Sequence, residues 1–141
     1  MLHLYSDGGA RGNPGPAGAG FVIKDDQGAV LMKQAVFLGE KTNNQAEYYG
    51  LLKAVIAAKK MGTHLLCHLD SQLVVKQMQG EYKIKDATLK LMAEEIRNQT
   101  HGLEVEYVHI RRELNGEADE MANLAMDRGK TPGDTFTFSA Q

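Results

Sequence analysis

Two apolar, strand-like runs in this chain each end on an aspartate that is followed by a turn residue. Asp7 closes residues 2–6 and precedes Gly8, and Asp70 closes residues 65–69 and precedes Ser71. In open α/β sheets ligands bind at the carboxyl ends of the strands, so acids in equivalent positions on neighbouring parallel strands would face one crevice. Converging carboxylates repel one another unless a cation neutralises them. The sequence therefore predicts an α/β fold with a divalent metal site, most simply for magnesium.

Two further acids lie on expected helices, at positions that border the core. Glu47 shares one helical face with Leu51, Ala54 and Ala58, and burying its charge there is costly unless it has a partner such as a metal. Asp119 borders a second apolar row on a later helix. Each acid also has an ordinary alternative role: a turn residue for the two strand-end aspartates, a helix-dipole acid for Glu47 and a solvated helix acid for Asp119.

Length and composition narrow the class of protein. The 141 residues are enough for one domain, and the single Cys67 excludes an intramolecular disulfide. The beginning of the sequence has no signal-peptide pattern and no run approaches the roughly 18 apolar residues of a membrane span, so we expect a cytoplasmic protein without a membrane partner. Setting four acids aside from the net charge of −2 leaves +2, so net charge does not decide for or against nucleic acid.

Hydrophobic periodicity and turn residues predict a mixed α/β order along the chain. An antiparallel meander is expected first, with a glycine-rich loop after its first strand and a hairpin turn at residues 25–28. The expected strands are 2–6, 18–24, 29–38, 63–69 and 103–110, and the expected helices are 44–60, 71–79, 87–98 and 115–127. We assign residues 1–128 to one domain and 129–141 to a C-terminal tail that is either flexible or an extension of the sheet edge.

Four motifs occur in order along nearly the whole chain. They are residues 5–9 with 12–15, residues 42–47, residues 69–71 and residues 115–119. Together they resemble the type 1 ribonuclease H family, and more closely its compact archaeal-like branch. The resemblance implies an RNase H-like α/β fold, in which a five-stranded mixed sheet, with three antiparallel strands followed by parallel strands, is flanked by helices.

The resemblance also implies an activity. The family hydrolyses the RNA strand of RNA/DNA hybrids internally, leaving 5′-phosphate and 3′-hydroxyl ends, with two magnesium ions for which manganese can substitute. The four acids of the family correspond to Asp7, Glu47, Asp70 and Asp119 in this sequence. We expect a monomer, and whether double-stranded RNA is also cleaved stays open. The alternatives are a non-catalytic module of the same fold that binds hybrids or double-stranded RNA, and a polymerase-associated or integrase-like member with extra domains.

The resemblance assigns substrate contacts as well. Asn13, Asn43 and Asn44 match positions that reach the shallow minor groove, where 2′-hydroxyls identify the RNA strand. Thr42 matches a residue that helps seat a phosphate of the DNA strand, where a hydroxyl and helix-start amides suit an anion. The alternative roles are a turn residue for Asn13 and helix capping for the others, and these are compatible with substrate contact.

The sequence departs from well-studied bacterial members in two respects. A basic helical protrusion after the second helix is missing, and Lys83 and Lys85 are too few to replace it in full, so weaker or more salt-sensitive substrate binding is expected. The mobile-loop histidine of many members matches His109 by counting. The predicted strand 103–110 instead includes His109, which leaves Arg111 or Arg112 for the loop. His109 or one of these arginines is therefore the candidate at that place.

Overall fold

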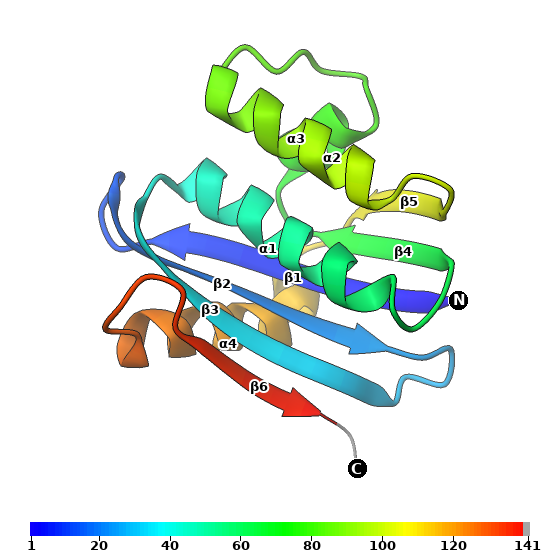
Figure 1. Ribbon diagram of the computed structural model, residues 1–141, viewed down its shortest axis with the longest axis horizontal. Helices are drawn as coiled ribbons and strands as arrows, with labels where there is room; N and C mark the ends of the chain where they lie inside the picture. The colour runs from blue at the N-terminus through cyan, green and yellow to red at the C-terminus, as the bar shows by residue number, and fades with distance from the viewer. Residues whose placement is uncertain (140–141) are drawn as a thin grey trace.

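One six-stranded sheet organises the chain. The computed structural model describes residues 1–139. Along the sheet the strands follow the order β5-β4-β1-β2-β3-β6 (Figure 1). In chain order the elements are β1 (Leu2–Ala10), β2 (Gly15–Lys24), β3 (Val30–Lys41), α1 (Asn43–Ala58), β4 (His64–Leu69), α2 (Gln72–Met78), α3 (Ala87–Gln99), β5 (Glu104–His109), the 3-10 helix η1 (Arg112–Asn115), α4 (Gly116–Arg128) and β6 (Thr135–Ser139).

The strand directions confirm the predicted mixed sheet. The strands β1, β2 and β3 run antiparallel to one another, whereas β4 runs parallel to β1 and β5 runs parallel to β4. The predicted strand number of five is wrong, because β6 pairs antiparallel with β3 as a sixth strand. Its alternating Thr and Phe residues suit a strand, and Phe136 packs against the small core cluster under α4.

The sixth strand lies within the expected tail. The structure places Thr135–Ser139 along the edge of the sheet, as in the edge-extension alternative, while residues 140–141 lie outside the described part of the chain. The division at residue 128 stays a prediction.

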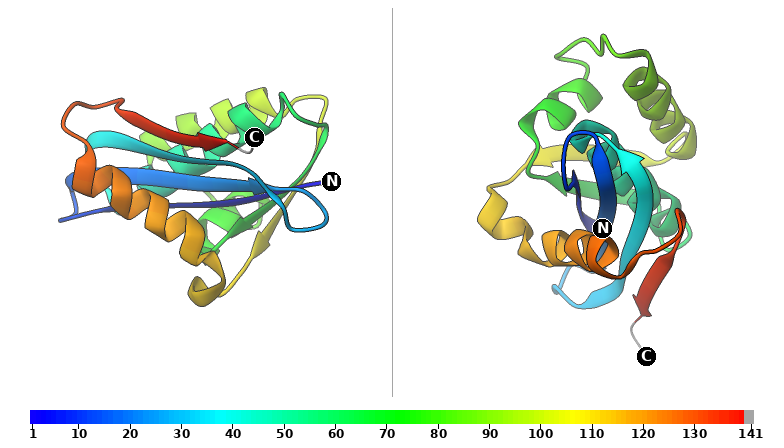
Figure 2. Two further views of the ribbon diagram at one scale, coloured as in Figure 1. Left: turned by 90° about the horizontal axis from the view of Figure 1, so that it is seen from below. Right: turned by 90° about the vertical axis from the view of Figure 1, so that its left-hand side faces the viewer.

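Helices cover both faces of the sheet. The helices α1, α2 and α3 lie on one face and α4 lies on the other (Figures 1 and 2). The larger core cluster joins the first face to α1, α2 and α3, and a smaller cluster lies between α4 and β3. Among residues 1–139, no helix is both long enough and apolar enough to cross a membrane.

The glycine-rich segment of residues 8–20 is largely paired strand rather than loop. Where the sequence predicted strands at 2–6 and 18–24, β1 continues to Ala10 and β2 begins at Gly15. The glycines provide space for helices: a Cβ on Gly8 would lie 2.1 Å from the carbonyl oxygen of Ala46 in α1, and one on Gly20 would lie 2.5 Å from the nitrogen of Ala122 in α4. These glycines therefore bring α1 and α4 close to the strands that carry the candidate site.

Candidate active site

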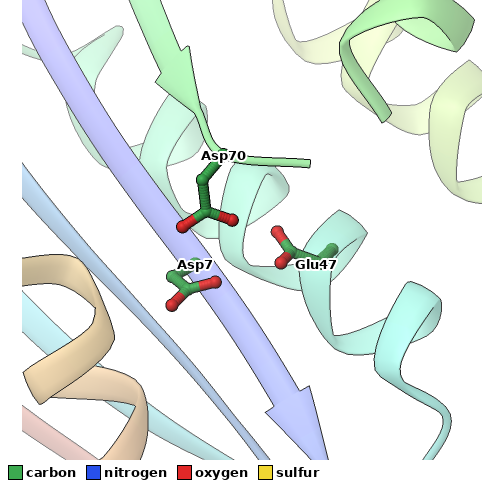
Figure 3. Close-up of side chains that lie close together, drawn as sticks. All are labelled: Asp7, Glu47 and Asp70. Carbon is green, nitrogen blue, oxygen red and sulfur yellow. The ribbon is translucent and has the colours of Figure 1, made fainter. Parts of the chain in front are cut away.

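Three of the four predicted acids come together beside the neighbouring strands β1 and β4. Asp7 lies on β1, Glu47 on α1 and Asp70 directly after β4, and each offers a carboxylate oxygen within 4.8 Å of the others (Figure 3). The parallel register pairs Ser6 with Leu69, so the two aspartates that follow them emerge side by side. We call Asp7, Glu47 and Asp70 the carboxylate cluster.

The carboxylate cluster is buried more deeply than charged groups usually are. Asp7 is 8% exposed and Glu47 is 9% exposed. Burial is the main cause that raises the pKa of Asp7 to about 7, and the nearby charge of Asp70 adds to it. Burial, followed by the charge of Asp7, raises the pKa of Glu47 well above its usual value. The geometry thus concentrates negative charge where water cannot fully stabilise it.

Nothing within residues 1–139 neutralises this charge. No Lys, Arg or His forms an ion pair with the carboxylate cluster in the described chain, and the neighbouring Arg11 is paired with Asp127 at 2.6 Å. The Oε2 atom of Glu47 is buried and has no hydrogen-bond partner among these residues. An unpartnered carboxylate oxygen beside two further carboxylates fits a hard divalent cation that takes oxygen ligands.

The fourth predicted acid faces the same cleft. Asp119 lies half-buried in the first turn of α4, and its carboxyl interacts with Asp7 in the direction that raises the pKa of Asp7 further. A cleft of about 570 Å³ is lined by all four acids and by Arg112. The structure therefore brings all four acids to one cleft, and the part that Asp119 plays in metal binding stays a prediction.

The predicted substrate contacts line a second hollow beside the cleft. This hollow of about 480 Å³ includes Asn13, Thr42, Asn43 and Asn44, and Asn43 also lines the cleft. Two of these side chains also hold the local backbone through hydrogen bonds. Asn13 Oδ1 accepts from the Asn43 backbone N–H at 3.0 Å, and Asn43 Oδ1 accepts from the Ala10 backbone N–H at 2.8 Å. Thr42 caps α1 in a reciprocal box with Gln45. Their contacts with substrate stay predictions.

The structure separates the three candidates for the loop position. His109 is the last residue of β5, which agrees with the strand prediction, and its Nε2 lies 3.2 Å from the carbonyl oxygen of Asp70. Arg112 follows in η1 and lines the cleft, whereas Arg111 precedes that helix. Of the three, Arg112 is therefore the one that lines the cleft, while the His109 ring contacts the backbone of Asp70.

A third hollow, of about 510 Å³, lies at the connection from α2 to α3. Its lining includes Lys83 and Lys85 of the connection together with Lys90 and Arg97 of α3. All four are exposed, and within residues 1–139 none of them forms an ion pair. The sequence pointed to the first two lysines alone, and the fold places Lys90 and Arg97 of the following helix in the same hollow.

Sequence reasoning missed a buried polar residue that contacts the carboxylate cluster. Asn115 was treated only as the start of the last helix, yet its side chain is buried and donates a hydrogen bond to Asp70 Oδ2 at 3.0 Å. An asparagine before a helix usually signals capping, so the sequence held no separate signal for this contact.

Comparison with known sequences finds relatives along most of the chain. A family described as reverse transcriptase-like matches residues 5–125. The chain is 42% identical over 127 residues to the Bifunctional protein Rv2228c of Mycobacterium tuberculosis, which covers 88% of this chain and 35% of that protein. It is 38% identical over 128 residues to a Ribonuclease HI of Halobacterium salinarum, which covers 89% of this chain and 64% of that protein. The chain thus spans about a third of the length of the mycobacterial relative.

Solved structures agree with these relatives. The structure of LC11-RNase H1 in complex with an RNA/DNA hybrid is 41% identical and superposes with a TM-score of 0.87, covering 91% of this chain and 98% of that one. The similarity thus extends over most of the chain, and the family match over residues 5–125 includes all four acids.

Proposed function

The chain belongs to the type 1 ribonuclease H family, and from that premise we propose that it is an endonuclease that hydrolyses the RNA strand of RNA/DNA hybrids. The observation that carries the proposal is the carboxylate cluster, whose oxygens converge within 4.8 Å from Asp7 on β1, Glu47 on α1 and Asp70 directly after β4. The hybrid bound to LC11-RNase H1 supports this class of substrate. Cleavage would leave a 5′-phosphate and a 3′-hydroxyl.

The donors of the site suit magnesium. Asp7, Glu47, Asp70 and Asp119 supply only carboxylate oxygens, which Mg²⁺ and Mn²⁺ prefer, and no His or Cys belongs to the cluster found within residues 1–139. We propose that these four residues hold two ions. Two bound divalent ions supply a nucleophilic hydroxide at neutral pH and stabilise the negative charge on the leaving oxygen.

The hollow beside the cleft supports recognition of the RNA strand. Asn13, Asn43 and Asn44 are exposed residues with short polar side chains, and such side chains can reach the shallow minor groove of an A-like duplex. Because Asn43 borders both the cleft and the hollow, a strand lying in the hollow would continue towards the carboxylate cluster. Thr42, at the start of α1, suits a phosphate of the DNA strand.

Cleavage of an end-labelled hybrid tests the proposal. We expect the purified 141-residue chain with Mg²⁺ to cut the labelled RNA strand internally, whereas the same strand in single-stranded form stays intact. EDTA and the Asp70→Asn variant serve as controls, and both should abolish cutting while circular dichroism shows that the variant is folded. Binding of the hybrid without cutting would favour the non-catalytic module instead. A parallel reaction on double-stranded RNA decides whether that duplex is a second substrate.

A further inference from the structure

Asn115 is a buried asparagine in an unusual position. It is 1% exposed, ends η1 and occupies the cap position of α4. An asparagine at such a position usually accepts a hydrogen bond from a backbone N–H of its own helix. Here the side chain makes no capping bond to α4. The residue type common at helix starts is therefore present, but its side chain is directed to other partners.

Those partners lie on the two strands of the candidate site. The Nδ2 amide of Asn115 donates to the Ser6 carbonyl at 2.9 Å and to Asp70 Oδ2 at 3.0 Å. Ser6 directly precedes Asp7 on β1, and its register partner Leu69 directly precedes Asp70. One amide group thus bridges the two strands at the point where each delivers a carboxylate to the cluster.

The same contact places the helix that carries the fourth acid. Asp119 follows Asn115 by four residues, about one helical turn, so the two lie on one face of α4. Fastening the start of α4 to β1 and β4 therefore also determines where Asp119 approaches Asp7. Asn115 connects all three elements that supply aspartates to the cleft.

The chemistry of an amide suits this place. A hydrogen bond from a neutral donor orients the Asp70 carboxylate, whereas a Lys or Arg would bring a positive charge that competes with a bound cation. A purely structural role explains the residue poorly, because Asn115 Oδ1 is buried and has no hydrogen-bond partner within residues 1–139. Leaving that oxygen unpaired costs stability. An apolar side chain of similar size would avoid this cost.

We propose that Asn115 is a positioning residue that couples β1 and β4 to α4 and thereby sets the affinity of the four acids for divalent cations. The inference rests on the metal site of the proposed function. Groups that hold metal-ligating side chains in place typically change metal affinity by about 10–100-fold when they are removed. We therefore expect substitution of Asn115 to weaken metal binding by more than a comparable loss of fold stability does.

Mn²⁺ binding to the full 141-residue chain, measured by calorimetry without nucleic acid, tests this role. The variants Asn115→Leu, which keeps the volume, and Asn115→Ala, which avoids a steric clash, should both bind Mn²⁺ about tenfold more weakly or worse. Gln77→Leu is the matched control: Gln77 is also a buried amide, 6% exposed, and it accepts from the Tyr48 hydroxyl at 2.6 Å. It does not line the cleft, so its variant should lose thermal stability and keep its Mn²⁺ affinity.

The outcomes separate this inference from the proposed function. Asn115 variants that bind Mn²⁺ within twofold of the wild type, or no more weakly than Gln77→Leu does, would overturn the positioning role and leave the proposed enzyme intact. A wild type that binds no Mn²⁺ would overturn the metal site itself. Cleavage kinetics provide a second readout: the Asn115 variants should lower kcat at fixed Mg²⁺ with little change in the KM for the hybrid. A higher Mg²⁺ concentration should restore part of the rate.

Discussion

Strands β1 and β4 carry two polar clusters, and the two clusters differ in how their charges are balanced. His3, His68 and Asp26 form the first, which we call the histidine cluster. His3 Nε2 donates to Asp26 at 3.0 Å, its Nδ1 lies 3.2 Å from His68 Nε2, and the Tyr5 ring stacks on His68 with centroids 4.3 Å apart. The second is the carboxylate cluster, in which a buried Glu47 oxygen has no partner among residues 1–139.

The two clusters differ in whether hydrogen-bond donors or only acceptors meet. The histidine cluster joins donors to acceptors, and Asp26 also pairs with the N-terminal amine at 3.2 Å, so its polar groups satisfy one another. The carboxylate cluster joins acceptors to acceptors. Such a set is stable only with protons or cations supplied from outside. Two polar clusters on the same pair of strands therefore have different needs: one is complete, and the other requires a ligand.

The largest expected effect separates the clusters by activity. Glu47→Gln removes a charge from the carboxylate cluster and should lower hybrid cleavage on the order of 10³-fold, because a proposed metal ligand is lost. His68→Gln should change cleavage by less than about twofold, since the histidine cluster lies outside the cleft. Cleavage rates with Mg²⁺ measure both. Equal losses in the two variants would show that the clusters are not functionally distinct.

A second prediction concerns the metal-free protein and pH. The folded pKa of Asp7, about 7, lies above its unfolded value of 3.8, so the folded state holds more protons between these values. Stability should therefore be present at low pH and fall as pH rises from about 4 to about 7. Thermal melts in EDTA should show a drop of about 5 °C or more across this window, and Glu47→Gln should reduce it. Adding Mg²⁺ near pH 7 should raise the melting temperature of the wild type and leave that of Glu47→Gln nearly unchanged.

The histidine cluster should change stability with pH in the opposite direction, over part of the same pH range. Burial, followed by the charge of His3, lowers the pKa of His68 to about 4 from 6.5, so the unfolded state binds more protons between these values. This contribution to stability is present above about pH 6.5 and is lost as pH falls towards 4. His68 is partly exposed, so we expect a modest effect of about 4 °C. Melts of His68→Gln with the wild type at several pH values measure it, and identical slopes would contradict the prediction.

The smallest effect concerns exposed charge outside both clusters. Replacing Lys83 and Lys85 by Gln should weaken hybrid binding a few-fold at low salt, and the salt dependence should decrease by roughly one unit of slope per lysine that contacts a phosphate. Binding of a hybrid to the cleavage-deficient Asp70→Asn protein at several salt concentrations measures this. Lys53→Gln on α1 is a charge-matched control that does not line any of the three hollows described above. An unchanged slope in the double variant would remove these lysines from the binding surface.

Much of the candidate site could be predicted because its signals are local. Asp7 and Asp70 each follow an apolar, strand-like run in the sequence, and Glu47 shows its inward position by its helical phase with Leu51. The glycine-rich segment was misjudged as a loop for a tertiary reason. Glycine favours turns in isolation, whereas Gly8 and Gly20 lie in strands and are required by the approach of α1 and α4.

The sequence by itself determined the type and order of the elements, the mixed sheet and the acids that belong together, because strand and helix periodicity places each side chain relative to its own element. Only the tertiary structure decided that β6 joins the edge of the sheet, that Arg112 borders the cleft and that Asn115 holds Asp70. Each of these depends on contacts between segments far apart in the chain. Such contacts follow from how closely the elements pack, and local sequence preferences do not contain that information.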